Sequence, residues 1–535
     1  MWQQDYFPVA DNLALSALLA AVPIFVLLTL IGLLRKPAWV AALSGLGAAV
    51  VMALLVYGMP LDLVVSSTTM GAAFGLFPIG WIVFWAIVLY RITVETGNFE
   101  VIKDSIGGVT SDRRLQALLI AFALGAFIEG AAGFGTPVAV AAAMLTGLGF
   151  SPFYAAGICL LANTAPVAFG SIGVPVITLA SVTGLPVDEL STWVGRLCAP
   201  ISVFIPAYLV MVMGGWRGLK GVLPAAVLCG VCFASMQLLI SSQVGPELVD
   251  IIAALTAIVV LVLLLKRWQP SDTFVMEGES QAVLTVQSHG FGRTVFAWSP
   301  YIYLVLFVLI WGSGILSGVL NSVSIEFAWP GLHNQVIRMA PVVDVPTPYA
   351  ALYNFNWLSA GGSACALATI AAAFTFRVSL AAYCKLLLSV LQQLAFSLLT
   401  IAAVLGLSYL MNYSGATSTL GLAFAVTGGL FPFFSAMLGW LAVFLTGSDT
   451  SANALFGNLQ VVTANSLSLD PVLMASANSA GGVLGKMISL QSIAVAVAAT
   501  GMSRSEEGKL FRFTFRHSLF LGSMVGLITM VYAYL

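Results

Sequence analysis

Long apolar stretches separated by short polar ones dominate the sequence. A membrane-spanning helix needs about 20 mostly apolar residues, and stretches of that length recur along the whole chain. The pattern predicts an all-α polytopic membrane protein with about twelve transmembrane helices. The expected spans are 13–34, 38–58, 65–91, 152–183, 193–215, 219–241, 248–266, 297–318, 355–376, 384–411, 470–500 and 517–535. The first is too long for the core of a signal peptide, so we expect it to be retained as a span.

Two further apolar stretches, 115–150 and 417–466, are interrupted midway by glycine and polar residues. Their arms of about 15 residues are short for a full crossing of the bilayer. Each stretch is therefore predicted to form a re-entrant hairpin that enters and leaves the membrane on one side. Irregular backbone at that depth is tolerated only where protein or a water-filled cavity satisfies its polar groups, so each hairpin tip is a candidate binding site.

Basic residues gather in the loops on one side of this predicted topology, whereas the opposite loops carry mainly acidic residues. By the positive-inside rule the basic loops are cytoplasmic and both termini lie outside. The basic residues concerned are Arg35, Lys36, Arg91, Lys103, Arg113, Arg114, Arg217, Lys220, Lys266, Arg267, Arg293, Arg377, Lys385, Arg504, Lys509, Arg512 and Arg516.

The two halves of the chain resemble each other. FIEG at 127–130 recurs as FLTG at 444–447, and NTAPVAFG at 163–170 recurs as NSAGGVLG at 478–485, at a nearly constant offset. The two hairpins open to opposite sides in the predicted topology, so the repeat is inverted, as in secondary transporters whose site lies at the midplane between the repeats. We assign an N-terminal half to residues 1–266, a cytoplasmic linker to 267–296 and a C-terminal half to 297–535.

Composition narrows the class of protein. Of 535 residues, 60% are hydrophobic and 8% are charged, and the mean hydropathy is +1.03. A soluble core cannot bury that much apolar surface, so the expected surroundings are membrane lipid. No basic stripe interleaves with aromatic residues, which argues against a nucleic-acid partner. The six cysteines follow no metal or disulfide spacing, and we expect neither a metal nor an organic cofactor.

The hairpin tips carry the two deep carboxylates. The first tip reads FIEGAAGFGTP from 127 to 137 and contains Glu129; the second reads TGSDTSANALFG from 446 to 457 and contains Asp449. An ionisable residue at that depth costs about 2.5–3.5 kcal/mol even on a lenient insertion scale, and therefore marks a functional site. A carboxylate taken out of water accepts a proton more readily. Glu129 and Asp449 are the predicted proton-coupling residues, and Asp449 is preferred because its tip is more polar.

The span after each hairpin contains a polar interruption, at 163–166 and at 478–482. Pro166 has no amide hydrogen, and the glycine pair at 481–482 weakens a helix, so the expected broken helices are 152–183 and 470–500. The helices that restart would direct their N-terminal ends at the protein centre, which suits a carboxylate. The predicted substrate-binding residues are Lys486, Asn163, Thr164, Thr136, Thr446, Ser448, Thr450, Ser451, Asn453, Asn478, Ser479, Ser489 and Gln491.

Each of these features also has a simpler interpretation. Lys486 could form a structural ion pair with Asp449 or Glu129, since buried charges normally pair. The asparagines could cap broken helix ends, and the glycines could serve close helix packing.

Four motifs carry a resemblance to a known family. They are EGAAGFGTPVAV at 129–140, NTAPVAFGSIGVP at 163–175, FLTGSDTSANALF at 444–456 and GKMISLQSIAVA at 485–496, joined by GPELVDII at 245–252. With them the chain resembles, over essentially its whole length, the L-lactate permease family of bacterial proton-coupled transporters, which includes the glycolate permeases. The resemblance implies symport of L-lactate, D-lactate, glycolate and other small 2-hydroxymonocarboxylates with protons into the cell across the plasma (inner) membrane.

Two other functions can be compared with proton symport. A sodium-coupled carboxylate symporter would use the same hydroxyl-rich tips and unwound carbonyls. A membrane-embedded enzyme is disfavoured, because the sequence has only three histidines and no HExxH, DDxxD or GxSxG motif. The oligomeric state is left open.

Overall fold

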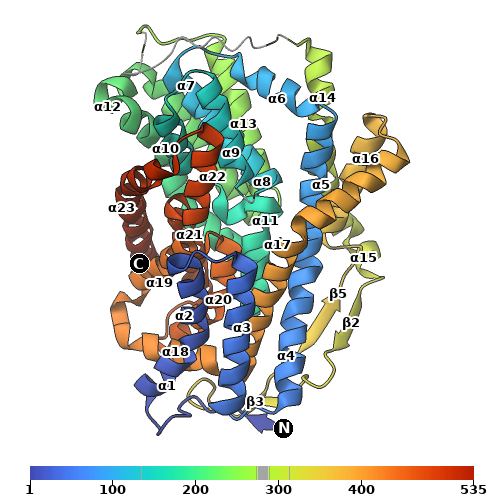
Figure 1. The fold of residues 1–535 in the computed structure, drawn as a ribbon, viewed down its shortest axis with the longest axis vertical. Helices are drawn as coiled ribbons and strands as arrows, with labels where there is room; N and C mark the ends of the chain where they lie inside the picture. Colours follow the sequence, from blue (N-terminus) through green and yellow to red (C-terminus); the bar gives the residue numbers. More distant parts are fainter. Residues whose placement is uncertain (134, 273, 275–286, 288, 313) are drawn as a thin grey trace.

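The computed structural model describes residues 1–535 except 134, 273, 275–286, 288 and 313. The described chain is almost entirely helical, and its few short strands lie towards one end of the molecule (Figure 1). By length and composition, nine of its helices could cross a membrane, or up to eleven if each of two bent helix pairs counts as one span. The predicted class, an all-α polytopic membrane protein, is confirmed.

The first helices precede the predicted hairpin at 115–150. Asn12 accepts the backbone N–H of Leu15 and so caps the first of them. Their bounds are α1 Leu13–Ala20, α2 Val22–Leu28, η1 Thr29–Leu33, α3 Ala38–Leu55, α4 Leu61–Phe74, η2 Gly75–Gly80, α5 Trp81–Glu95 and α6 Asn98–Gly107.

The predicted hairpin at 115–150 is built from α7 (Arg113–Gln116), η3 (Ala117–Leu124), α8 (Gly125–Ala131) and α9 (Thr136–Gly147). Its first arm is longer than the predicted 15 residues, because α7, η3 and α8 continue without a break from Arg113 to Ala131. The bent pair follows, with α10 (Pro152–Ala162), η4 (Val167–Phe169) and α11 (Gly170–Thr183). The two parts meet at 64°, so the predicted break at 163–166 is confirmed.

The predicted spans 193–215 and 219–241 lie in one long element, α12 (Val187–Gln243). Its backbone leaves the helical conformation at Gly215 and Val222, so the chain still turns between the two predicted spans. Helix α13 (Val249–Leu265) follows, and then α14 (Phe291–Gly312) and α15 (Gly314–Asn321). Residues 273, 275–286 and 288 of the predicted linker at 267–296 lie outside the described residues, and the last residues of the linker, from Phe291 on, belong to α14.

The segment from 322 to 360 forms strands that the sequence pattern did not indicate. Strand β2 (Ile325–Ala328) pairs antiparallel with β5 (Leu352–Phe355), with Ile325 opposite Phe355. Strand β3 (Val336–Arg338) lies between β1 (Trp2–Gln3) and β4 (Thr347–Pro348). The predicted span 355–376 therefore begins too early: its first residue ends β5, and helix α16 starts only at Gly361.

The remaining helices contain the second hairpin and the second bent pair. The hairpin turns between α19 and α20, and α21 and α22 form the bent pair at 42°. The bounds are α16 Gly361–Thr375, α17 Leu380–Ser414, α18 Ala416–Phe424, η5 Ala425–Leu430, α19 Phe431–Thr446, α20 Asp449–Ser466, α21 Pro471–Gly485, η6 Lys486–Ile488, α22 Leu490–Thr500, η7 Arg504–Glu506 and α23 Glu507–Tyr534.

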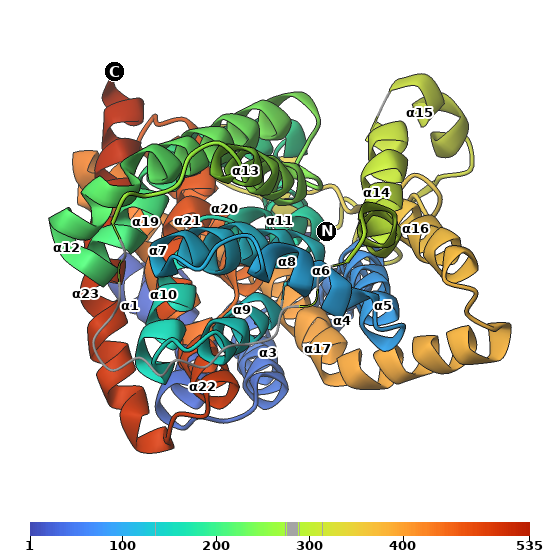
Figure 2. The same ribbon diagram turned by 90° about the horizontal axis from the view of Figure 1, so that it is seen from above.

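The two hairpins and the two bent pairs interlock at the centre of the molecule. Helices α9 and α10 pack against α22, and α11 packs against α20. Seen from above, α14, α15 and α16 lie on the opposite side of the molecule from α12, α19 and α23 (Figure 2). Elements that are distant in sequence therefore meet around one central region.

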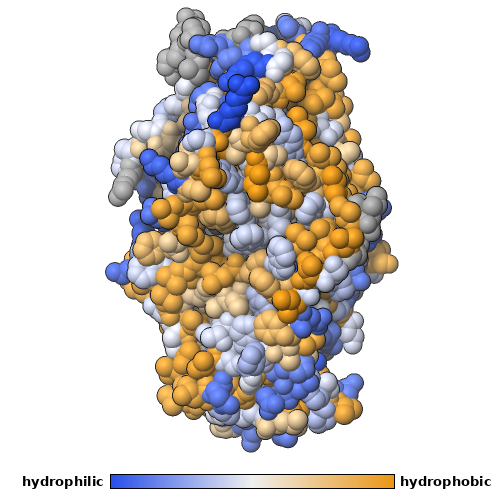
Figure 3. Space-filling model, turned by 90° about the vertical axis from the view of Figure 1, so that its right-hand side faces the viewer, coloured by the Kyte–Doolittle hydropathy of each residue, from blue (hydrophilic) through white to orange (hydrophobic). Residues whose placement is uncertain are grey.

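The surface agrees with a membrane environment. Figure 3 shows hydrophobic side chains spread over the middle of one face, with hydrophilic ones gathered towards its two ends. Large apolar side chains are exposed on several helices, among them Phe25, Trp216, Phe374 and Phe396. Apolar surface of this extent is covered by lipid in a multi-pass membrane protein.

Candidate functional site

Four helices begin around one cavity of about 140 Å³. Its lining includes the first residues or the N-caps of α9, α11, α20 and α22, contributed for example by Gly135, Gly170, Ser448 and Gln491. Each helix start carries free backbone N–H groups and a partial positive charge. The cavity is small compared with the sites of drug-sized ligands, so the arrangement suits a small anion.

The chain reverses at the first hairpin tip by means of two glycines. Gly133 and Gly135 have φ of +61° and +80°, values that other residues adopt only with strain. A Cβ at Gly133 would overlap Ser171 Oγ of the bent pair, and this hydroxyl donates to the carbonyl of Ala132 at 3.1 Å. The tip of the first hairpin is therefore held directly against the break between α10 and α11.

The second hairpin tip is capped by its own hydroxyl groups. Ser448 Oγ accepts the backbone N–H of Ser451 at 3.2 Å at the start of α20. Thr446 Oγ1 donates to the carbonyl of Ala442 at 2.8 Å and accepts from the N–H of Ser448 at 3.3 Å. Thr450 and Ser451 line the cavity, and their hydroxyls have no hydrogen-bond partner among the described residues. These two hydroxyls are free to meet a ligand.

Lys486 and Glu129 form an ion pair on the cavity wall. Lys486 Nζ lies 3.2 Å from Glu129 Oε1, and both side chains are buried. Asn163 Nδ2 donates to the other oxygen, Glu129 Oε2, at 2.9 Å. Both residues of the pair line the cavity, so the charge of Lys486 is available there while Glu129 balances it.

Asp449 lines the same cavity but has only uncharged partners among the described residues. Its Oδ2 accepts from Ser479 Oγ at 2.6 Å and from Asn453 Nδ2 at 3.3 Å. Its Oδ1 is buried and has no partner in the described part of the chain. Because a buried ionised carboxylate needs a cation or several donors, a charge on Asp449 is less well compensated by its hydrogen-bond partners than the charge on Glu129.

Two of the predicted binding residues stand behind Asp449 rather than at the cavity. Asn453 Nδ2 also donates to the carbonyl of Pro175 at 3.1 Å, and its Oδ1 accepts from Asn478 Nδ2 at 2.9 Å. Gln460 Nε2 in turn donates to Asn478 Oδ1 at 3.0 Å. Asn478 is fully buried, so this chain of amides orients Asp449 from behind.

The structure thus divides the predicted site residues into two groups. Those that line the cavity are Glu129, Thr446, Ser448, Asp449, Thr450, Ser451, Lys486 and Gln491. Those outside its lining are Thr136, Asn163, Thr164, Asn453, Asn478, Ser479 and Ser489. In the second group, Thr164 Oγ1 donates to the carbonyl of Leu161 at 2.6 Å, and Ser489 caps α22 by accepting the N–H of Ser492 at 3.2 Å.

The second bent pair breaks later than predicted. Helix α21 continues through Asn478, Gly481 and Gly482 to Gly485, and the break lies at η6 and Ser489. The glycines serve close packing instead: a Cβ at Gly481 would overlap the carbonyl of Ala436 in α19, and one at Gly439 would overlap that of Asn478. The later break places Lys486 at the turn itself.

Sequence reasoning missed several residues of the cavity. Ser171 and Ser492 line it; both lie inside the quoted motifs, in the first turn after a break, and this position could have indicated them. Ser397 and Thr400 line it from α17, a helix that reads as an ordinary span. Asp250, at the start of α13, is buried outside the cavity lining, and its Cβ lies against Gly130, the neighbour of Glu129.

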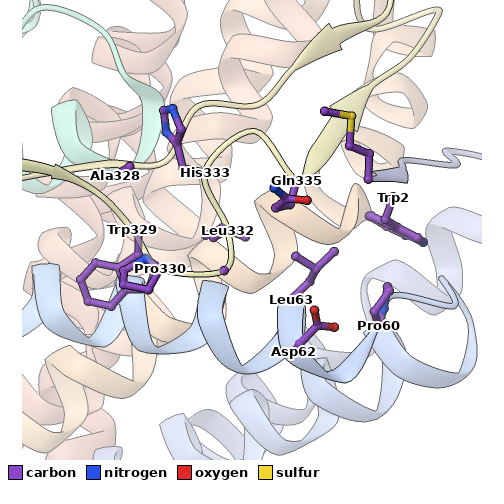
Figure 4. A pocket seen from close by; sticks show the side chains of 12 residues that line it. Trp2, Pro60, Asp62, Leu63, Ala328, Trp329, Pro330, Leu332, His333 and Gln335 are labelled. Atoms are coloured by element: carbon purple, nitrogen blue, oxygen red, sulfur yellow. The ribbon is translucent and has the colours of Figure 1, made fainter.

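A larger pocket lies at the end of the molecule that carries the strands (Figure 4). Its volume is about 580 Å³, and its lining includes Trp2, Asp62, Trp329, His333 and Gln335. No lysine or arginine side chain of the described residues belongs to this lining.

A polar cavity enclosed by interrupted membrane helices is the arrangement of secondary transporters, and this is the class that the fold and the site define. The model of the L-lactate permease family matches residues 16–535. The chain belongs to the L-lactate permease family.

Similar proteins cover nearly the whole chain. The L-lactate permease of Bacillus subtilis (strain 168) is 45% identical, over 99% of this chain and 98% of its own length. The glycolate permease GlcA of Escherichia coli (strain K12) is 44% identical, over 100% and 98%. The L-lactate permease of Salmonella typhimurium is also 44% identical, over 100% and 98%.

Two transporters of known structure align with this chain. The YdaH transporter of Alcanivorax borkumensis aligns with a TM-score of 0.44 at 14% identity, over 88% of this chain and 87% of its own. MtrF of Neisseria gonorrhoeae aligns with a TM-score of 0.47 at 12% identity, over 90% and 86%.

Proposed function

We propose that this protein imports L-lactate, together with D-lactate, glycolate and related small 2-hydroxymonocarboxylates, by proton symport. It would work in the bacterial plasma (inner) membrane with both termini outside. The relatives named as L-lactate and glycolate permeases support this substrate class. The observation that carries the proposal is the Lys486–Glu129 ion pair on the wall of a small cavity where four helix N-termini meet.

The ion pair suggests how an anion and a proton are coupled. A substrate carboxylate entering the cavity meets Lys486 and the helix starts, and it competes with Glu129 for the lysine. Once Lys486 binds the substrate, Glu129 becomes a buried carboxylate without a cation, which is stable only when protonated. Binding of one anion therefore requires uptake of one proton, and the loaded carrier has the same net charge as the empty one.

Uncharged groups of the cavity account for recognition of the 2-hydroxyl group. The hydroxyls of Thr450 and Ser451 and the side-chain amide of Gln491 line the cavity. Each can donate to or accept from a hydroxyl group. Asp449 accepts hydrogen bonds from Ser479 and Asn453. While its carboxyl group is protonated, it can also donate a hydrogen bond, and it provides a second site for the coupled proton.

The test is uptake of labelled L-lactate into proteoliposomes with an imposed inward pH gradient and no sodium. Accumulation above the external concentration, abolished by a protonophore, would support proton symport. Accumulation that requires added sodium at fixed pH would replace the proton by sodium as the coupling ion. Uptake of glycolate but not of lactate would keep the mechanism and change the preferred substrate.

A further inference from the structure

Asp250 is a buried carboxyl group outside the cavity lining. It is the second residue of α13, and 1% of it is exposed to solvent. Both of its carboxyl oxygens are buried, and neither has a hydrogen-bond partner among the described residues. An ionised carboxylate is rarely buried without a partner, so the observed environment is that of a protonated group.

Helix packing holds Asp250 directly behind Glu129. The neighbour of Glu129 in α8 is Gly130, and a Cβ at Gly130 would lie 2.7 Å from the Cβ of Asp250. Only glycine lets α13 approach α8 so closely at this point. Glu129 itself lines the cavity, where it pairs with Lys486, whereas Asp250 does not belong to the cavity lining.

The groups that face Asp250 are few. Of the elements packed against α13, α8 presents Glu129 and α12 presents Cys198. Elements η3 and α11, which also pack against α13, contain no Asp, Glu, His, Lys or Arg. Lys486 lies beyond Glu129, and in the described residues Asp250 forms no ion pair with it. Glu129 is therefore the carboxyl group with which Asp250 can exchange a proton.

Asp250 can also exist in the ionised form. The first turn of α13 carries backbone N–H groups without intrahelical partners, and the helix start favours negative charge. A proton carrier has to be stable in both forms, and this position offers an apolar surrounding for one and a helix start for the other.

We propose that Asp250 is a proton-carrying residue of the transport cycle, which holds the coupled proton behind Glu129 and passes it to Glu129 when the substrate takes Lys486. In this step the O–H bond of the Asp250 carboxyl group breaks and an O–H bond forms on Glu129. Asp250 becomes the carboxylate and is reprotonated from the side of the membrane with the higher proton concentration. The inference rests on the proposed proton symport and adds a residue to it.

The test compares Asp250→Asn with the wild-type protein in proteoliposomes, after proton-driven accumulation has been established for the wild type. Asp250→Asn removes the exchangeable proton with almost no change in shape. We expect proton-driven accumulation at neutral pH to fall at least tenfold, whereas exchange of labelled for unlabelled L-lactate at equal, acidic pH, where Glu129 can take its proton from the solution, stays within about twofold of the wild type. Exchange returns the loaded carrier without releasing its proton, so a merely structural defect would reduce it as well.

The matched control is Glu247→Gln. Glu247 is a partly exposed carboxyl group three residues before Asp250, beside Gly361 of α16, and this variant is expected to accumulate and exchange as the wild type does. Wild-type accumulation in Asp250→Asn, or an equal loss of exchange and accumulation in a correctly folded variant, would overturn the proposal. Failure of the wild type itself to use a pH gradient would instead refute the proposed symport.

A measurement on the wild type covers the case in which Asp250→Asn does not fold. An apolar carbodiimide reacts with protonated carboxyl groups in apolar surroundings, and we expect it to modify Asp250 at neutral pH and to inhibit accumulation. Peptide mass spectrometry would locate the modification. Inhibition without modification of Asp250 would overturn the proposal.

Discussion

The two hairpin tips bring one carboxylate each to the same cavity but treat it differently. At the first tip, Glu129 is paired with Lys486 and held by Asn163. At the second tip, Asp449 has only the neutral donors Ser479 and Asn453, and one of its oxygens has no partner among the described residues. The comparison indicates that the first tip stores charge that a substrate can displace, while the second provides neutral polar groups that a substrate can bind.

Substitution of Lys486 should have the largest effect, because it removes the charge on which the first tip depends. Lys486→Gln leaves Glu129 buried without a cation, and breaking a buried pair in this way costs about 3–5 kcal/mol. We expect a lower melting temperature in detergent and loss of L-lactate transport. Thermal unfolding and uptake, measured on the same preparation, check both.

The double variant Lys486→Gln with Glu129→Gln separates stability from transport. It removes both charges, so the melting temperature should return close to that of the wild type while transport stays absent. If the single variant Lys486→Gln transports lactate normally, the first tip does not bind the substrate through its cation.

Glu129→Gln should affect coupling more than binding. The substitution leaves Lys486 without its partner, so a carboxylate substrate no longer has to displace Glu129. We expect L-lactate to bind at least as tightly as in the wild type, with proton-driven accumulation reduced at least tenfold. Equilibrium binding and uptake under a pH gradient give the two readouts. Equal losses in both would assign Glu129 to substrate binding instead.

Asn163→Ala and Ser479→Ala compare the two carboxylates directly. A hydrogen bond to a charged group contributes about 1.5–3 kcal/mol, and one to a neutral group about 0.5–1.5 kcal/mol. If Glu129 is charged and Asp449 is neutral in the empty protein, Asn163→Ala loses more stability than Ser479→Ala. Melting temperatures at neutral pH make the comparison, and the reverse order would show that Asp449 carries the charge.

Ser448→Ala should give the smallest effect. It removes the side-chain cap of α20, which contributes about 0.5–2 kcal/mol, whereas α9 at the first tip has Gly135 at its N-cap and therefore no side-chain cap. We expect a modest fall in melting temperature with transport largely retained. A large loss of substrate affinity would mean that the Ser448 hydroxyl itself contacts the substrate.

The sequence predicted the main parts of this arrangement. Apolar stretches located the helices, and the polar interruptions in them located both hairpin tips and the first break, because glycine, proline and a deep charge are costly in a lipid-exposed helix. Glu129, Asp449 and Lys486 could be singled out for the same reason, and all three line the cavity.

The parts that could not be predicted depend on which faces meet in three dimensions. Gly481 and Gly482 weaken a helix in isolation, but here they allow α21 to approach α19. The helix therefore continues past them and breaks only at Lys486. The partner of Lys486 was open between Glu129 and Asp449, and only the three-dimensional arrangement of the helices decided it. Asp250 lies in the motif GPELVDII at 245–252. The sequence alone does not mark it as buried, because its burial depends on the close approach of Gly130 from a distant segment.

The close contact of α19 and α21 has a mechanical consequence. At Gly439, Gly481 and Gly485 the two helices touch backbone to backbone, so at these three points no side chain lies between them that could slide or repack. The second hairpin tip and Lys486 lie at the ends of these two helices, so we expect them to move together as one rigid unit. Glu129 lies in α8, outside this unit. Any movement that separates this unit from α8 has to break the Lys486–Glu129 ion pair. The same two side chains therefore close the cavity and provide the charge that attracts the substrate.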